Sequence, residues 1–175
     1  MRKHNGMRPQ DIVILLKIIA INNNNWQLKN LATLLHLSAS EVSESLNRSR
    51  VAGLIDYKKE KIKRQSLMEF IEHGLHYVFP QAPGTIVNGI PTAHSHPFMK
   101  QYFDSELMYV WNDFKGKEKG LAIEPLYPKQ VDAIKHDEVL YKMLALVDVI
   151  RVGKTREIAV AVKELNKMII DGLLD

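Results

Sequence analysis

Six of the polar or charged side chains between residues 40 and 50 are candidates to form hydrogen bonds with one ligand. Arginine and asparagine can each bond two atoms on one base edge, and serine can reach a base or a phosphate. At about 100° per residue, Ser40, Ser43, Glu44 and Asn47 fall on the helix face opposite the apolar positions. Arg48 and Arg50 fall to the sides, where either bases or phosphates are within reach. The candidate base-reading residues are Ser40, Ser43, Glu44, Asn47, Arg48 and Arg50.

A basic segment follows these residues closely. It contains Lys58, Lys59, Lys61, Lys63 and Arg64. Residues 1–65 hold 12 lysines and arginines against 5 acidic residues, a charge of +7, whereas the remainder has 12 against 15, or −3. Such asymmetry is expected where one module faces phosphates. The alternative is a solvated edge hairpin whose lysines prevent edge-to-edge pairing.

Three helices are predicted before the basic segment. Pro9 suits a helix start, since proline lacks the N–H that the first turn leaves unpaired, and apolar residues then recur at helical spacing up to Ala20. The asparagines at 22–25 end this first helix. Leu28, Leu31, Ala32 and Leu35 predict the second. Ser38 and Glu41 form a capping-box pattern, so a third helix begins near Ala39 and closes at Gly53.

A small hairpin and a fourth helix are predicted next. Residues 54–57 alternate like a strand, residues 58–61 read as a charged turn, and Ile62 begins the return strand. Ser66 can cap a further helix that stops at Pro80. The predicted order is therefore three helices, a hairpin wing and a fourth helix.

This order resembles a known family. The stretch Leu28-Lys-Asn-Leu-Ala-Thr-Leu-Leu-His-Leu-Ser-Ala-Ser-Glu-Val-Ser-Glu-Ser-Leu, followed by Val-Ala-Gly-Leu-Ile, resembles bacterial winged helix regulators of the MarR-like kind. The likeness implies a winged helix-turn-helix domain. The second helix of the helix-turn-helix enters the major groove. His36 stands where such motifs usually carry the turn glycine, so the turn is a residue longer or holds a strained histidine. The alternative is a helical hairpin that only packs against another protein.

The chain after residue 78 reads as a separate part. Five glycines and prolines within residues 81–97 predict a linker or an irregular ordered loop. Residues 107–111 and 121–123 are expected to pair as a hairpin, and helical spacing resumes after Pro128 with a break at Gly153. The prediction is thus a mainly α fold with a small β-hairpin wing. Residues 1–78 form the winged helix-turn-helix, and residues 79–175 form an α-rich part for dimerisation or a partner.

Several kinds of site are excluded or disfavoured. The chain has no cysteine, which rules out disulfides and thiolate chemistry and favours the cytoplasm. Its longest apolar run is too short to span a bilayer, and its first six residues are too polar for a signal peptide. His94 and His96 lack a defined third metal ligand. Asp148 replaces the first glycine of a P-loop pattern ending at Thr155. We therefore expect no enzyme, metal or cofactor.

A second resemblance concerns the C-terminal part. Gly74-Leu-His-Tyr-Val-Phe-Pro-Gln-Ala-Pro-Gly, Gly89-Ile-Pro-Thr-Ala-His, Glu124-Pro-Leu-Tyr-Pro and Leu146-Val-Asp-Val-Ile-Arg-Val-Gly-Lys-Thr-Arg-Glu resemble bacterial winged helix proteins encoded beside nucleotidyltransferase-type abortive-infection toxins. This likeness implies an autoregulatory or antitoxin-like role. The expected function is a homodimeric, sequence-specific regulator that binds double-stranded DNA. The alternative is an adaptor that neutralises a partner toxin and keeps the winged helix as scaffold; a hydrolase or metal enzyme comes third.

Overall fold

The computed structural model describes residues 6–23 and 25–174, and this part is mainly α-helical with a small three-stranded sheet. The expected fold class is confirmed at that level. The predictions for residues 1–5 and for Asn24 lie outside the described residues. The described helices of seven residues or more are α1 (Pro9–Ile21), α2 (Leu28–Leu34), α3 (Ala39–Val51), α4 (Arg64–His73), α8 (Glu138–Val152) and α9 (Thr155–Ile169).

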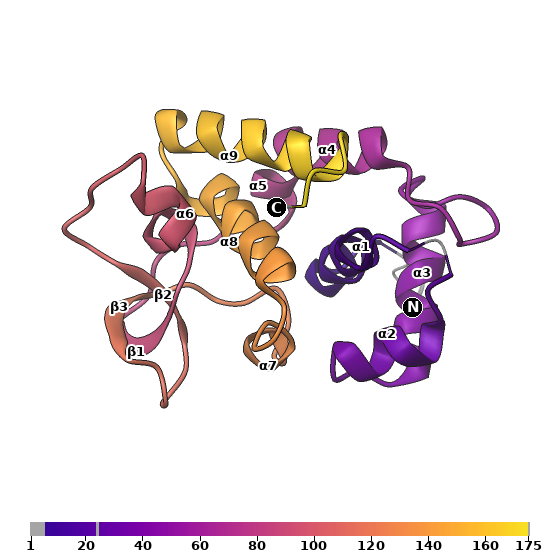
Figure 1. Ribbon diagram of the computed structural model, residues 1–175, viewed down its shortest axis with the longest axis horizontal. Coiled ribbons are helices and arrows are strands. Elements are labelled where there is room, and N and C mark those ends of the chain that lie inside the picture. The colour runs from indigo at the N-terminus through magenta and orange to yellow at the C-terminus, as the bar shows by residue number, and fades with distance from the viewer. Residues whose placement is uncertain (1–5, 24, 175) are drawn as a thin grey trace, which may run out of the picture.

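Helix α1 lies at the centre of the molecule. Pro9 occupies its first turn, as predicted, and Asn22 ends it with a left-handed φ of 49°. Residues 11–19 are all buried, because α1 is covered by α2 and α3 on one side and by α8 on the other (Figure 1). A helix that is apolar nearly all round is typical of a core position rather than a surface.

Helices α2 and α3 are joined by a tight turn at residues 35–38. Ser38 Oγ accepts a hydrogen bond from the Glu41 backbone N–H at 3.1 Å, and Glu41 Oε2 accepts one from the Ser38 backbone N–H at 2.9 Å. This confirms the predicted capping box and the start of α3 at Ala39. His36 has a φ of 53°, so the turn contains a left-handed histidine, one of the two forms expected there.

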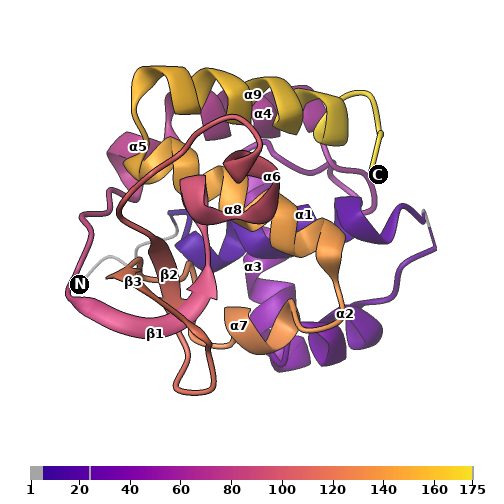
Figure 2. The ribbon, with the colours of Figure 1, turned by 60° about the vertical axis from the view of Figure 1, so that its left-hand side comes forward.

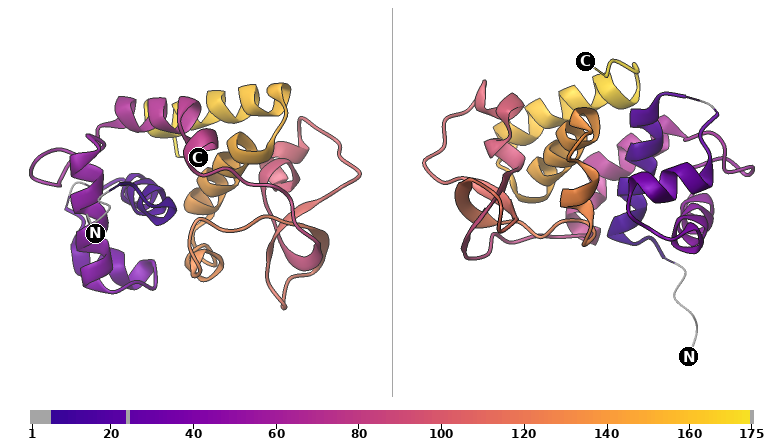
Figure 3. Two further views of the ribbon diagram at one scale, coloured as in Figure 1. Left: turned by 180° about the vertical axis from the view of Figure 1, so that it is seen from behind. Right: turned by 60° about the horizontal axis from the view of Figure 1, so that its bottom comes forward.

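The chain between α3 and α4 forms a loop, residues 54–63, that protrudes beside α3 (Figures 1 and 3). Ile55 and Ile62 form one antiparallel bridge across it. Helix α4 begins at Arg64 with Lys63 in the cap position, so the cap predicted at Ser66 is wrong by three residues. The Leu67 N–H already bonds the Lys63 carbonyl, and buried Leu67 and Met68 fix that first turn by packing rather than by a cap. After a break at Gly74, α5 (Leu75–Val78) ends this part.

The sheet corrects two predictions. Strand β1 (Ile86–Pro91) lies within the region expected to be a linker, and it pairs antiparallel with both β2 (Tyr109–Asn112) and β3 (Glu118–Ala122). β2 and β3 were expected to form a hairpin, but they pair in parallel. Each of the three strands therefore has hydrogen bonds to both of the others. Gly89 makes this closure possible: a Cβ there would lie 2.0 Å from the Trp111 carbonyl oxygen.

Three short elements complete the described part. η1 (Ala93–Ser95) and α6 (Pro97–Lys100) lie between β1 and β2, and α7 (Gln130–Ala133) lies between β3 and α8. Gly153 separates α8 from α9 as predicted. Helix α9 packs against both α8 and α4, and α7 and α2 occupy the opposite side of the molecule (Figure 2).

One hydrophobic core runs through the described residues. It includes Ile12, Leu15, Leu31, Leu46 and Leu54 of the N-terminal part, and it continues into α8 and α9. Polar contacts also join the two parts. Among them, Lys17 forms an ion pair with Asp137, and Tyr127 Oη donates to the Leu35 carbonyl at 2.9 Å. The boundary predicted at residues 78 and 79 therefore does not separate two cores.

Candidate nucleic-acid interface

The outward face of α3 carries most of the predicted base-reading side chains. Val42 and Leu46 are buried, and Ser40, Glu44 and Asn47 are exposed. Ser43 is half-buried at the edge of this face. Because the capping box fixes where α3 begins, it also fixes which residues point outward. The hydrogen bond from the Ser38 backbone lowers the pKa of Glu41, so this carboxylate remains charged and caps the helix near its positive end.

Arg48 does not belong to that face. Its Nε and Nη2 donate to the two carboxylate oxygens of Asp11 at 2.9 and 2.6 Å, and Asp11 is fully buried in α1. The hydrogen bond to Asp11 raises the pKa of Arg48. The guanidinium thus joins α3 to α1, and we remove Arg48 from the candidate contacts.

Arg50 is placed between α3 and the 54–63 loop. Its guanidinium lies 5.3 Å from the ring centroid of Tyr57, a distance typical of a cation–π contact. Tyr57 is 83% exposed. The pair leaves a cation and an aromatic face at the surface, next to the outward face of α3.

The 54–63 loop presents most of the predicted lysines to solvent. Lys58, Lys61 and Lys63 are exposed, while Lys59 is half-buried with a left-handed φ of 60°. Asp56, which sequence reasoning missed, shapes the loop: its Oδ1 accepts the backbone N–H groups of Glu60 and Lys61 at 2.7 and 3.1 Å. These bonds lower the pKa of Asp56. An aspartate just before a turn is the signal for such a motif.

Arg64 also departs from its predicted role. Its Nη1 donates to the carbonyl oxygen of Ile169, at the last residue of α9, at 2.6 Å. The side chain therefore reaches back toward α9 instead of extending the row of loop lysines. Ser40, Ser43, Glu44, Asn47, Arg50, Lys58, Lys59, Lys61 and Lys63 remain as candidate contacts on α3 and the adjoining segment.

The buried carboxylate of Asp148 supports the fold through its hydrogen bonds. Asp148 in α8 is fully buried and accepts hydrogen bonds from Thr92 Oγ1, Trp111 Nε1 and Arg151 Nη1 at 2.9, 2.7 and 2.8 Å. Burial raises its pKa, while these three donors favour the charged form. Arg151 also donates to the carbonyl oxygens of Phe79 and Glu124. The cluster ties the sheet and two loops to α8, and sequence reasoning noted Asp148 only as a departure from a P-loop.

The two histidines considered as metal ligands each have a separate partner. His94 Nε2 lies 2.8 Å from the Leu107 carbonyl oxygen, and His96 Nδ1 accepts the Phe98 backbone N–H at 3.2 Å. Burial is the main reason why the pKa of His96 falls to about 4, and the charge of Lys142 adds to it. Within residues 6–23 and 25–174, no three side chains of His, Asp or Glu are grouped so that they could hold a metal.

The outward face of α3 and the adjoining lysines therefore form a surface with two kinds of group. Asn47 offers an amide donor and acceptor, and Ser40 offers a hydroxyl, which suits base edges. The lysines are point charges on flexible stems, which suits phosphates. No long apolar helix suited to crossing a membrane is present in the described part.

Comparison of the chain with protein-family models, curated proteins and solved structures found no match.

Proposed function

We propose that this chain is a winged helix-turn-helix regulator that binds double-stranded DNA. Helix α3 would enter the major groove with Ser40 and Asn47 toward the bases, and the 54–63 loop would act as the wing. The observation that carries the proposal is the exposed, polar face of α3 beside a lysine-rich loop, on a helix pair joined by a tight turn.

Several contacts support a rigid presentation of α3. The Asp11–Arg48 pair holds its middle to α1, and the capping box holds its first turn. The Tyr127–Leu35 hydrogen bond braces the turn before it. Rigid elements place hydrogen-bonding groups more accurately than flexible loops do, which specific base readout requires.

We also propose that the chain acts as a homodimer. One helix in one groove gives a small interface, whereas two copies reach two half-sites and double the contacts. In this proposal the pairing surface lies outside α3 and the 54–63 loop, so that both remain free for DNA.

Salt dependence of DNA binding tests the first proposal. Each phosphate neutralised contributes about 0.9 to the slope of log affinity against log salt. Replacing Lys58, Lys59 and Lys61 with alanine should therefore make the slope shallower by about 2 to 3, with a similar loss for every DNA sequence. The matched control replaces Lys117, Lys119 and Lys163, which carry the same charge, are exposed and belong to the turn before β3, to β3 and to α9. No binding by the wild type, or equal effects of both triple variants, would contradict the proposal.

A further inference from the structure

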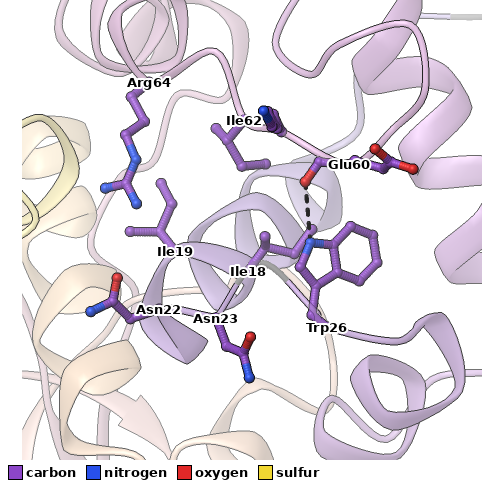
Figure 4. Close-up of a pocket in the computed structure, with 9 residues that line it drawn as sticks. Ile18, Ile19, Asn22, Asn23, Trp26, Glu60, Ile62 and Arg64 are labelled. Carbon is purple, nitrogen blue, oxygen red and sulfur yellow. Dashed lines mark hydrogen bonds between the residues drawn. The ribbon is translucent and has the colours of Figure 1, made fainter.

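A cavity of about 330 Å³ lies between the C-terminal end of α1, the chain that leads to α2 and the second half of the 54–63 loop. Ile18, Ile19 and Ile62 supply aliphatic lining, and the indole of Trp26 adds an aromatic surface. Figure 4 shows these side chains around a common space. Cavities of this size and mixed lining are typical of small-molecule sites.

Two polar side chains on one side of the cavity can bind an anion. The guanidinium of Arg64 extends toward Ile19, and the amide of Asn22 lies below it (Figure 4). Arg64 uses Nη1 for the Ile169 carbonyl, which orients the group and leaves its other N–H donors for a ligand. Arginine presents paired donors in the geometry that a carboxylate accepts.

The other polar groups do not oppose an anion. Trp26 Nε1 donates to the Glu60 carbonyl oxygen at 3.3 Å, which fixes the indole against the loop. The Glu60 carboxylate points away from the Arg64 guanidinium (Figure 4). Lys61 also lines the cavity and adds a second positive charge.

We propose that this cavity binds a small monocarboxylate with an apolar body. The carboxylate bonds Arg64 and Asn22, and the apolar body packs against the three isoleucines and Trp26. A neutral analogue of the same shape lacks the charge that Arg64 selects, so it binds more weakly.

The occupied cavity weakens DNA binding, a consequence that rests on the proposed function. Lys61 lines the cavity and also belongs to the predicted phosphate-contacting row. Ile62 lines it as well and forms the bridge to Ile55 that closes the loop. An anion in the cavity attracts Lys61 away from phosphate and fixes the loop from within. The coupling is reciprocal, so DNA weakens ligand binding by the same factor.

The first experiment measures binding without DNA. Hexanoate, hexanamide and inorganic phosphate are titrated into ¹⁵N-labelled full-length protein while the two indole N–H signals are followed. Trp26 lines the cavity, whereas Trp111 is buried against Asp148 and serves as an internal reference. We expect hexanoate to move the Trp26 signal alone, and hexanamide to need at least a tenfold higher concentration. Equal responses to hexanoate and hexanamide, a response to phosphate only, or no response would overturn the site.

Variants test the assigned residues. Arg64→Gln should weaken hexanoate binding at least tenfold, and Asn22→Gly should weaken it severalfold while keeping the left-handed backbone that glycine adopts readily. Arg156→Gln removes an exposed arginine outside the cavity and should leave hexanoate binding unchanged. An unchanged affinity in both cavity variants would overturn the assignment even if Arg64→Gln were poorly folded, because Asn22→Gly stands independently.

The second experiment measures DNA affinity with and without saturating hexanoate. We expect at least about a fivefold loss with ligand, a typical size for such coupling. Hexanoate binding with unchanged DNA affinity would overturn the coupling and leave the site. Absence of DNA binding altogether would contradict the proposed function, and the Trp26 titration would still decide the site.

Discussion

Replacement of Arg48 by methionine tests whether this side chain supports the fold or contacts DNA. Methionine keeps most of the aliphatic stem but removes the guanidinium. In the structure that group donates twice to Asp11, which is fully buried and also accepts the Arg8 backbone N–H at 2.8 Å. The variant therefore leaves a buried carboxylate without its counter-charge.

The size of the effect follows from that burial. Breaking a buried ion pair by removing one partner lowers the free energy of unfolding by about 3–5 kcal/mol. For a chain of this length, each kcal/mol lowers Tm by about 2–4 °C, so Tm should fall by about 6–20 °C. Adding Asp11→Asn removes the unpaired charge and keeps an acceptor for Arg8. The double variant should therefore be more stable than Arg48→Met alone, although it has lost more native groups.

Urea unfolding followed by far-ultraviolet circular dichroism measures these differences. Arg50→Met is the matched control, because the same chemical change two residues away removes a cation–π contact with exposed Tyr57 and should lower stability by about 1 kcal/mol or less. If Arg48→Met unfolds within 1 kcal/mol of the wild type yet loses DNA binding, the ion pair is not what holds Arg48, and its original assignment as a DNA contact is restored.

Three further predictions concern separate parts of the molecule. Asn47→Ala should weaken binding at the preferred DNA site by about 1–3 kcal/mol and relax selection at one base pair. The measurement is the DNA affinity over single-base variants of a selected site. A parallel loss of affinity at every position would show that Asn47 reads no base. Tyr127→Phe should lower the free energy of unfolding by about 1–2 kcal/mol, because it leaves the Leu35 carbonyl without its donor. It should also speed amide hydrogen exchange in the 35–38 turn. Unchanged exchange there would contradict the bracing role of Tyr127. His96 has a pKa near 4 when folded and near 6.5 when unfolded, so the unfolded chain binds the extra proton and stability falls as pH drops from about 6.5 to 4, by up to about 3 kcal/mol. Urea unfolding at several pH values should show this slope in the wild type and a shallower one in His96→Gln; equal slopes would exclude His96 as the cause.

Local signals in the sequence predicted most of the helices near α3. Pro9, the Ser38–Glu41 pair and Gly153 each act within a few residues of their own position, so their effects can be read without the fold. The outward face of α3 followed from the same local information, because the cap sets the phase of the helix.

Contacts between distant residues were missed for the same reason. Asp11 and Arg48 are 37 residues apart, and the local pattern already explained Arg48 as a polar side chain beside a recognition face. Strand β1 was hidden because glycines and prolines dominate residues 81–97, although Ile86, Val87 and Ile90 favour a strand. β2 and β3 pair in parallel within a closed sheet in which β1 also pairs with both, and no local pattern reveals that arrangement.

The burial of α1 carries a consequence for how the two parts of the chain depend on each other. Its sequence was interpreted as amphipathic, but Val13, Ile14 and Ile18 are also apolar, which predicts burial on more than one side. In the structure α3 packs against one face of α1 and α8 packs against another, and Lys17 forms an ion pair with Asp137. A fragment of residues 1–78 would expose an apolar face of α1 and leave Lys17 unpaired. The sequence alone divided the chain after residue 78, whereas the shared core favours folding of the described residues as one cooperative unit. In that unit the C-terminal helices hold α1 and, through Asp11 and Arg48, set the position of α3.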